Sequence, residues 1–371
     1  MERAFGDVFQ GIPVLVTGHT GFKGSWLSVW LNELGAEVIG YSLDPPTVPS
    51  NFEASRLARR IVDARDDVRE LDALQRAIAE FKPQVVFHLA AQTIVRASYI
   101  NPKETFDVNV GGTVNVLEAA RSASSVRAVV CITTDKCYEN QEWMWGYREN
   151  DRLGGRDPYS ASKAMAELAI SAYRQSFFPP DRYAEHRVAV ASTRAGNVIG
   201  GGDWGANRLV PDCVRALMES RTIHVRNPRS VRPWQFVLEP LSGYLWLAAR
   251  LLQEGGGFAQ AWNFGPLERL AVSVEDLIQE LIQLWGAGDW KDVSSDQAPH
   301  EAGLLMLSWE KAANLLGWQP IYTWRQALAE TLGWFKEYHE RDSSADMYDV
   351  CVAQIRRYVD RARELGVAWV A

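Results

Sequence analysis

Cysteine is scarce in this chain of 371 residues, which contains only four. Cys131, Cys137, Cys213 and Cys351 are scattered, without the paired spacing of a metal site or the density of a disulfide-stabilised scaffold. We therefore expect reduced thiols, a cytoplasmic protein and no metal centre.

Long hydrophobic runs and blocks of positive charge are also absent. No apolar stretch approaches the roughly 20 residues of a membrane span, and the opening segment, MERAFGDVFQ, does not read as a signal peptide. The formal net charge is −7 and no block of Lys and Arg suggests a polybasic arm. The sequence therefore predicts a protein that binds neither membranes nor nucleic acids.

The first half of the chain alternates short apolar runs with amphipathic stretches. Strand patterns at 12–18, 36–43, 83–91, 126–134 and 187–200 alternate with helical patterns at 24–35, 68–81, 113–123 and 160–177. Strands and helices in this alternation are typical of βαβ units. We predict an α/β fold with a Rossmann-type, doubly wound parallel sheet.

The pattern changes after about Gly200. A Gly-rich loop comes first, and helical patterns follow at 272–286 and 308–320, with no clear linker between the two halves. We predict a dinucleotide-binding domain over 1–199, with a returning segment around 231–253. A smaller substrate-binding domain, interleaved with the first, is expected over 200–371.

The segment VLVTGHTGFKGSW carries three glycines in a G-x-x-G-x-x-G spacing between the first predicted strand and helix. Gly18 permits a tight turn, Gly21 lets a pyrophosphate approach the backbone, and Gly24 lets the helix pack closely on the strand. The helix N-terminus then offers free N–H groups to the anion. This context favours dinucleotide binding over an ordinary Gly-rich turn.

The acid that usually binds the adenosine ribose lies about 20 residues beyond the glycines. Asp44 has this spacing but follows the end of the predicted strand, so it is either the ribose ligand or a turn residue, and Ser42 is the alternative. For that reason the sequence indicates a choice between NAD and NADP less strongly than it indicates a dinucleotide. Asp63 is either a partner of the adenine amino group or a solvated loop residue.

Tyr159 and Lys163 are spaced i and i+4 in DPYSASKAMAEL, which places them on one face of a helix. A Tyr hydroxyl titrates near 10 in water, so a base near neutral pH needs a pKa lower by about three units. A nearby ammonium and a cationic nicotinamide supply such a shift. With Thr134 at an earlier strand end, the pair favours catalysis over a surface contact.

These motifs together carry a resemblance to a known superfamily. TGHTGFKG, HLAAQ, NVGGT, TTD and YSASK resemble the extended short-chain dehydrogenase/reductase superfamily, and SWEKAANLLGWQP is similar to its sugar-nucleotide members. More narrowly, TTDKCYENQEWMWGYRE, GGGDW and VRPWQFVLEPLSGYLWLA resemble the CDP-glucose 4,6-dehydratases. One departure is Phe236, where that family leads us to expect His.

The resemblance implies a set of binding residues. It implies NAD, in preference to NADP, and a nucleotide-sugar substrate. The cofactor ligands that it implies are Gly18, Thr20, Gly21, Phe22, Lys23, Gly24, Asp63, Leu89, Ala90, Gln92, Tyr159 and Lys163. The substrate ligands expected on the same grounds are Arg96, Asn197, Arg208 and Arg232.

The resemblance also implies a reaction in three stages on one sugar. Hydride leaves C4 while Tyr159 accepts the 4-hydroxyl proton, directly or through Thr134. The ketone then acidifies C5–H, water is eliminated across C5 and C6, and the hydride returns to C6. Asp135 would be the acid of the elimination and Lys136 its base.

An adjacent acid and amine have an energetic cost in these roles. The working form, protonated Asp135 with neutral Lys136, lies about 9 kcal/mol above the ion pair in water. Burial must reduce that gap, because desolvation disfavours both charges. Neighbours on an extended chain point to opposite faces, so only a bend after Thr134 lets both reach one sugar. A structural ion pair is the alternative.

Arginine forks match phosphate oxygens, so Arg208 and Arg232 are the favoured ligands of the substrate pyrophosphate. Arg194 is either a third ligand or an anchor for an Asp inside the fold. Trp143 and Trp145 are either a lid over the sugar or ordinary packing residues.

Two other function classes remain open. One is an epimerase or reductase on the same scaffold, which the Asp–Lys pair disfavours. The other is a non-catalytic nucleotide sensor, which intact Thr134, Tyr159 and Lys163 disfavour. We expect a homodimer or homotetramer.

Overall fold

A seven-stranded, fully parallel sheet organises the computed structural model, which describes residues 4–268, 272–294, 304–341 and 345–370. Its strand order is β11-β6-β5-β4-β1-β2-β3. The strands are β1 (Pro13–Thr17), β2 (Glu37–Ser42), β3 (Val62–Arg65), β4 (Val85–His88), β5 (Ala128–Ile132), β6 (Ala189–Ala195) and β11 (Ala261–Phe264). The order reverses beside β1, which confirms the predicted doubly wound α/β fold.

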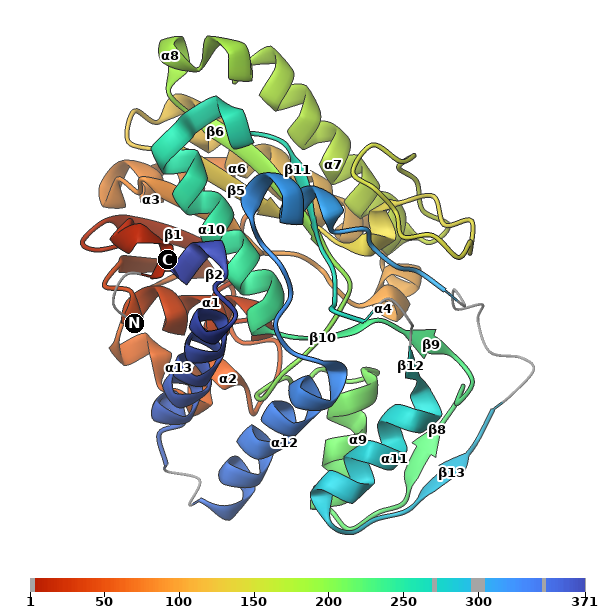
Figure 1. Ribbon diagram of the computed structural model, residues 1–371. Helices are drawn as coiled ribbons and strands as arrows, with labels where there is room; N and C mark the ends of the chain where they lie inside the picture. The colour runs from red at the N-terminus through yellow and green to blue at the C-terminus, as the bar shows by residue number, and fades with distance from the viewer. Residues whose placement is uncertain (1–3, 269–271, 295–303, 342–344, 371) are drawn as a thin grey trace.

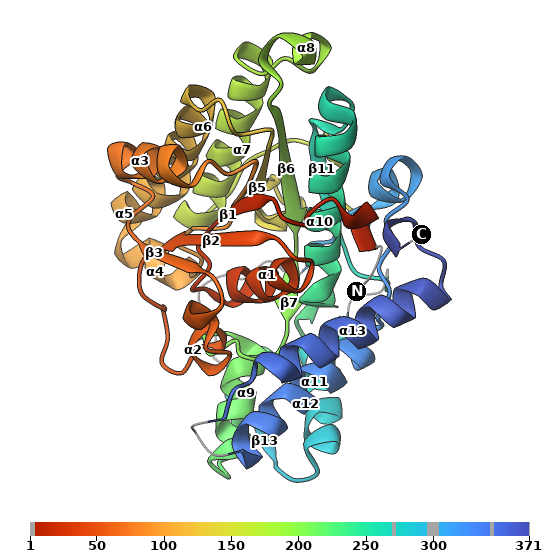
Figure 2. The same cartoon turned by 90° about the vertical axis from the view of Figure 1, so that its left-hand side faces the viewer.

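Both faces of the sheet are covered by helices (Figure 2). Val14 and Val16 point into the core under one helical layer, whereas Leu15, between them, points into the other core. Because both faces are buried, the central strands are continuous apolar runs. One layer holds α3 (Leu71–Phe81), α6 (Gly112–Ser122) and α7 (Pro158–Ser176); the other holds α1 (Phe22–Glu33), α10 (Leu238–Glu254) and α13 (Tyr348–Glu364).

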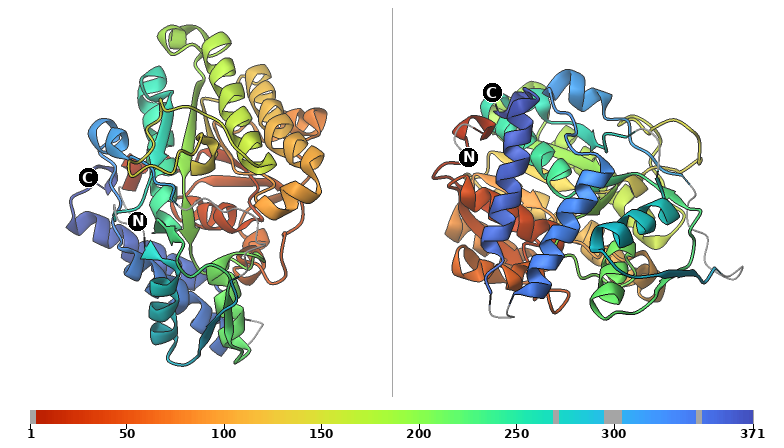
Figure 3. Two further views of the ribbon diagram at one scale, coloured as in Figure 1. Left: turned by 90° about the vertical axis from the view of Figure 1, so that its right-hand side faces the viewer. Right: turned by 60° about the horizontal axis from the view of Figure 1, so that its bottom comes forward.

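A smaller lobe lies beyond the carboxyl ends of the strands, at the lower right of Figure 1. It contains α9 (Leu209–Met218), α11 (Val274–Trp285), α12 (Trp324–Glu340), β8 (Ile223–Val225) paired with β13 (Trp290–Asp292), and β9 (Val231–Arg232) paired with β12 (Val272–Ser273). Two short strands, β7 (Asn197–Ile199) and β10 (Trp234–Phe236), pair in the segment between the lobe and the sheet. Figure 3 shows α12 running beside α13, which links the lobe to the sheet layers.

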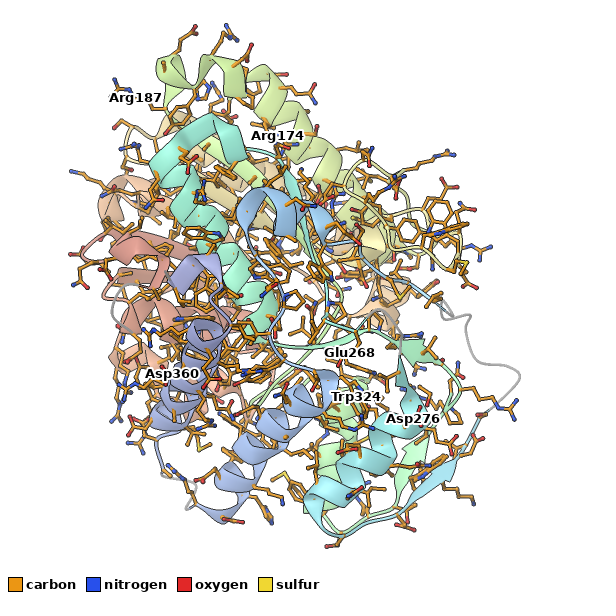
Figure 4. The ribbon with its side chains drawn as sticks, viewed as in Figure 1. Arg174, Arg187, Glu268, Asp276, Trp324 and Asp360 are labelled. Carbon is orange, nitrogen blue, oxygen red and sulfur yellow. The ribbon has the colours of Figure 1, made fainter. Side chains whose placement is uncertain are left out.

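Local capping fixes the lobe's helices. Ser273 caps α11 by accepting a hydrogen bond from the backbone N–H of Asp276, and Thr323 caps α12 with a reciprocal bond to Gln326. Glu268 accepts a hydrogen bond from the backbone N–H of Trp324, 3.1 Å away, at the start of α12 (Figure 4). The start of α12 is thereby tied to the segment after β11.

The remaining elements are short. The helices are α2 (Asn51–Ala54), α4 (Val95–Ile100), α5 (Pro102–Phe106) and α8 (Tyr183–His186). The 3-10 or π turns are η1 (Ala4–Asp7), η2 (Leu57–Arg59), η3 (Asp107–Gly111), η4 (Asp135–Cys137), η5 (Pro180–Arg182), η6 (Gly255–Phe258), η7 (Ala312–Leu316) and η8 (Ala368–Val370). Within the described ranges, no helix is both long and apolar enough to cross a membrane.

The first and last described segments meet in one aromatic cluster. The Phe5 ring stacks on Trp369 with centroids 4.9 Å apart, and both side chains are buried. Trp30 and Tyr358 complete the cluster from α1 and α13. β11 and α13 return to the sheet layers from the later part of the chain. The expected domain boundary stays a prediction.

Candidate active site

A long cavity runs along the carboxyl ends of the strands into the smaller lobe. The lining near β1 includes Gly18, Gly21 and Gly24, and the lining at the end of β5 includes the catalytic candidates Thr134, Asp135, Lys136, Tyr159 and Lys163. The substrate candidates also line it, namely Arg96, Asn197, Arg208 and Arg232. The fold therefore brings most of the predicted site residues to one cavity.

The glycine loop is shaped for close approach of a ligand. Gly18 has φ +76°, and a Cβ there would lie 2.7 Å from the backbone nitrogen of Ala90. A Cβ on Gly24 would lie 2.1 Å from the Gly18 carbonyl oxygen, which explains the tight packing of α1 on β1. Gly21 is the N-cap of α1 and has no side chain to cap the helix. The first N–H groups of α1 therefore face the cavity without a capping hydrogen bond from a side chain. These features fit a dinucleotide pyrophosphate.

The residues beyond the loop revise part of the predicted cofactor site. Ser42 and Asp44 both line the cavity, and Thr20 lies 3.0 Å from the Ser42 hydroxyl. The predicted adenine partner Asp63 is not among the lining residues, and its carboxylate is held by His19 and Arg65 at 2.7 Å each. Asp66, Asp67 and Val68 line that end instead.

Gln92 also differs from the prediction. Its side chain faces the protein interior, where it donates to the Ile94 carbonyl and to Thr105 and accepts from the Ile94 N–H. It does not line the cavity, whereas Leu89 and Ala90 do. Gln92 therefore shapes the loop after β4. The residues of this motif that line the cavity are its neighbours.

The end of β5 contains the bend that the acid–amine pair requires. The segment Asp135–Cys137 forms the 3-10 turn η4, with Thr134 as its N-cap. Thr134 donates to Asp135 Oδ1 at 2.9 Å, and the Lys136 ammonium lies 3.5 Å from the same oxygen. Asp135 is buried, whereas the Lys136 side chain is 36% exposed. Both side chains line the cavity, which an extended chain would prevent.

Tyr159 lies in the first turn of α7, where Asp157 caps the helix. Its hydroxyl is hydrogen-bonded to Thr134, and burial raises the pKa of Tyr159 to about 12. Burial also lowers the pKa of Lys163 to about 8. Near neutral pH these surroundings therefore hold the phenol in its protonated form.

Lys23 is a further cation of the centre. It lines the cavity, and its ammonium donates to the Tyr244 hydroxyl at 3.3 Å. Burial and the nearby charges of Lys163 and Arg208 lower the pKa of Lys23 to about 8, against the opposing charge of Asp135.

The arginines divide into two groups. Arg208 lines the cavity and reaches Asp203 at 2.8 Å and Thr93 at 3.2 Å. Arg232, on β9, lines it as well. Arg194 is instead buried against Glu167 at 2.8 Å, so it is an internal anchor. Its partner is a glutamate on α7, in place of the expected Asp.

The structure also places the aromatic residues that the sequence analysis singled out. Trp143 and Trp145 are exposed and do not line the cavity, although Gln141 and Glu142 of the same loop do. Trp143 stacks on Tyr147, which is the packing alternative. Phe236 is fully buried between Trp26 and Tyr322, so the departure from His lies in the core.

Comparison with known proteins gives one matching family model and several relatives. Residues 14–262 match the NAD dependent epimerase/dehydratase family. A CDP-glucose 4,6-dehydratase of Salmonella typhimurium is 52% identical over 334 residues, which cover 90% of this chain and 92% of the relative. A dTDP-glucose 4,6-dehydratase of Streptomyces griseus is 29% identical and is covered to 94%, with 88% of this chain.

Solved structures share the fold at lower identity. A UDP-glucose 4-epimerase of Thermotoga maritima with UDP-glucose superposes with a TM-score of 0.75 at 21% identity, over 89% of this chain and all of that one. The dTDP-glucose 4,6-dehydratase DesIV of Streptomyces venezuelae, with NAD and TYD bound, gives 0.74 at 24% identity, over 91% of this chain and all of that one.

Proposed function

This chain belongs to the NAD dependent epimerase/dehydratase family, and on that premise we propose that it dehydrates CDP-D-glucose to CDP-4-keto-6-deoxy-D-glucose. It is then a hydro-lyase of deoxysugar and surface polysaccharide biosynthesis. The observation that carries the proposal is the turn η4, which directs Asp135 and Lys136 into the same cavity as Tyr159. An epimerase or a simple reductase has no need for this second acid and base.

The cavity supports NAD as the cofactor. The Gly18–Gly24 loop and the N-terminus of α1 would hold its pyrophosphate, and Ser42, Asp44 and the 66–68 segment line the adenosine end. When bound there, NAD supplies hydride acceptance from C4 and hydride return to C6. The sugar nucleotide would extend into the other arm, past Arg208 and Arg232.

Tyr159 performs the first proton transfer. Its phenolate oxygen takes the proton of the sugar 4-hydroxyl and becomes the phenol, and Thr134, hydrogen-bonded to Tyr159, orients this oxygen. Lys163, in its protonated form one helical turn away, stabilises the phenolate that this step requires.

Asp135 and Lys136 perform the elimination. In the resting pair the ammonium and carboxylate are 3.5 Å apart, so moving one proton from Lys136 to Asp135 makes the working form at constant total charge. Neutral Lys136 then removes the C5 proton, and protonated Asp135 donates to the departing 6-hydroxyl, which leaves as water.

A substrate panel tests the proposal. We expect CDP-glucose to yield a 4-keto-6-deoxy sugar faster than dTDP-, UDP- or GDP-glucose, with NAD needed in catalytic amount and no net NADH. Faster dehydration of another sugar nucleotide would overturn the assignment of cytidine as the preferred nucleoside of the substrate. NADH formed in step with product would indicate a simple dehydrogenase instead.

We further propose that the protein acts in the cytoplasm as a homodimer or homotetramer. All four cysteines are free and buried, which fits a reducing compartment. Large apolar side chains are exposed on the packed helices α4 and α7, namely Tyr99, Ile100, Met165 and Leu168. Light scattering should show an oligomer that Ile100→Asp with Leu168→Asp converts to monomer, whereas a monomeric wild-type protein would refute the assembly.

A further inference from the structure

A buried carboxylate lies one helical turn beyond Lys163 and takes no part in the chemistry proposed above. Glu167 follows Tyr159 and Lys163 at the spacing i, i+4 and i+8, so all three lie on one face of α7. Its side chain is 3% exposed. A charge this deeply buried needs a full set of partners.

Glu167 has that set, and its partners connect three elements. One carboxylate oxygen accepts from the Thr133 hydroxyl at 2.5 Å; the other accepts from Ser192 and from Arg194, each at 2.8 Å. Thr133 directly precedes the catalytic Thr134 at the end of β5. The catalytic helix is therefore tied to two central strands at their carboxyl ends.

Arg194 extends these contacts to the far side of the catalytic turn. Its guanidinium donates to the Tyr138 hydroxyl at 2.6 Å and to the Glu149 carbonyl at 3.0 Å, and it lies 4.9 Å from the Tyr138 ring centroid. Tyr138 directly follows η4. The ion pair thus holds the residue before and the residue after the segment Thr134–Cys137.

We infer that Glu167 and Arg194 are a positioning pair, which fixes both ends of the catalytic turn and places a permanent negative charge behind Lys163. The inference rests on the proposed function, since it assigns a support to the residues named there. Neither residue of the pair is assigned contact with the substrate, because both act through Thr133, Tyr138 and Lys163.

The Glu167 charge shifts the pKa of Lys163 in a definite direction. Burial alone would raise the pKa of Glu167, but Arg194 and the hydrogen bonds hold it below its ordinary value, so the carboxylate is charged. Burial lowers the pKa of Lys163, and the Glu167 charge opposes that fall. Removing this charge should lower the pKa of Lys163 further, so the protonated amine is lost at a lower pH.

Other titratable groups also face the two residues and stay unchanged in the test. Those near Lys163 are Lys23 on α1, His88 on β4, Cys131 on β5 and Cys137 on η4. Arg174, on α7 itself (Figure 4), is a further cation near Glu167.

The first measurement titrates Lys163 without turnover. Trace acetylation with acetic anhydride over a pH series, read by mass spectrometry of the peptide that carries Lys163, gives the midpoint at which the amine becomes reactive. We expect Glu167→Gln to lower that midpoint by about half a pH unit or more. Glu167→Asp keeps the charge and should lie near the wild type. Glu118→Gln, which removes a partly buried ion-paired carboxylate on α6, should leave the midpoint unchanged.

Glu167→Gln leaves Arg194 buried without its partner, so this variant could fail to fold. The double variant Glu167→Gln/Arg194→Met removes both charges and keeps the same predicted direction. An unchanged Lys163 midpoint in either folded variant would overturn the electrostatic role. This result does not depend on the substrate, so it is separate from a failure of the wild type to dehydrate CDP-glucose.

The second measurement tests the turn. In the folded variants that lack Glu167, we expect kcat at the optimal pH to fall by about 10²-fold, as for a small misplacement of catalytic groups, with a much smaller change in KM. A loss confined to the amount of folded protein, with wild-type kcat per folded molecule, would show that the pair is only structural.

Discussion

The surroundings of Tyr159 oppose the task that we propose for it. Burial raises the pKa of its phenol to about 12, yet the reaction needs the phenol as a base. Tyr159→Phe should therefore lose even the first hydride transfer, by more than about 10²-fold, because the 4-hydroxyl proton has no acceptor. Single-turnover NADH absorbance measures this step.

The same helix supplies a control for that variant. Tyr173 also lies on α7, but its hydroxyl donates to Glu118 outside the cavity. Tyr173→Phe should reduce NAD at the wild-type rate. Fast NAD reduction retained in Tyr159→Phe would remove Tyr159 from the base role.

Lys136 separates the two halves of the reaction. Lys136→Ala leaves Thr134, Tyr159 and Lys163 in place, so C4 should still be oxidised. Removal of the C5 proton should slow by about 10² to 10⁴, the usual contribution of a positioned base. Solvent deuterium exchange at C5 in a single turnover measures the loss.

The control is Lys103→Ala, which removes an exposed ion-paired amine on α5. It should exchange at the wild-type rate. Wild-type exchange in Lys136→Ala would assign the C5 proton to another group, and Lys136 would then be a charge partner of Asp135. Lys136→Glu shortens the reach to C5 and makes the working pair more negative, so we expect partial activity at best.

The site residues that could be predicted from the sequence are those whose motif fixes their backbone. The glycine loop and the Tyr159–Lys163 spacing act through local geometry, which sequence order determines. Asp63 and Gln92 could not be placed in this way, because their side chains turn inward to partners on other elements, such as His19 and Thr105. Glu167 was missed because its partners lie directly after β5 and on β6.

Among the elements, the junction of β1 and α1 leaves no room for a larger side chain at Gly24. A Cβ at Gly24 would overlap the Gly18 carbonyl oxygen, so Gly24→Ala should push α1 away from the loop. We expect a loss of about 1–3 kcal/mol in the free energy of unfolding, the range for overpacking, and weaker NAD binding. Urea unfolding and calorimetric titration with NAD measure the two effects.

Gly333→Ala is the matched control. Gly333 lies within α12, and a Cβ there would meet no other atom within 4 Å. This substitution should stabilise the protein slightly, by up to about 1 kcal/mol, through helix propensity. Unaltered NAD affinity in Gly24→Ala would mean that the loop tolerates a shifted helix.

At this scale the sequence predicts the first half better than the second. The alternation of strands and helices locates β1, β2, β4, β5 and β6 with their helices. The pattern fails for α10, which is buried over most of its surface and has no polar face to mark its period. It also fails for β11, a four-residue strand that joins the sheet only through long-range pairing with β6.

At the scale of the whole molecule, one buried acid connects α10 to two later parts of the chain. Glu239 on α10 accepts hydrogen bonds from the Ile321 and Tyr322 N–H groups and from the Tyr358 hydroxyl on α13. Burial raises the pKa of Glu239 to about 7. A raised pKa means that the folded state retains a proton that the unfolded state releases, so this contribution is full below pH 4.5 and disappears as pH rises through 7.

Glu239→Gln should remove that pH dependence, because the amide keeps one accepting oxygen and does not titrate. Between pH 5.5 and 8 we expect the wild type to lose about 2 kcal/mol more in free energy of unfolding than the variant does. Urea unfolding at the two pH values gives both differences. Equal pH dependence in the two proteins would mean that Glu239 has an ordinary pKa.

The aromatic cluster of Phe5, Trp30, Tyr358 and Trp369 has a consequence for synthesis in the cell. The ribosome synthesises Phe5 long before Trp369, the residue whose ring stacks on it. Until then the early strands can pair while Phe5 and one side of Trp30 remain uncovered. Final packing of this core must wait until Trp369 has been synthesised, so the nascent chain exposes an aromatic surface until then.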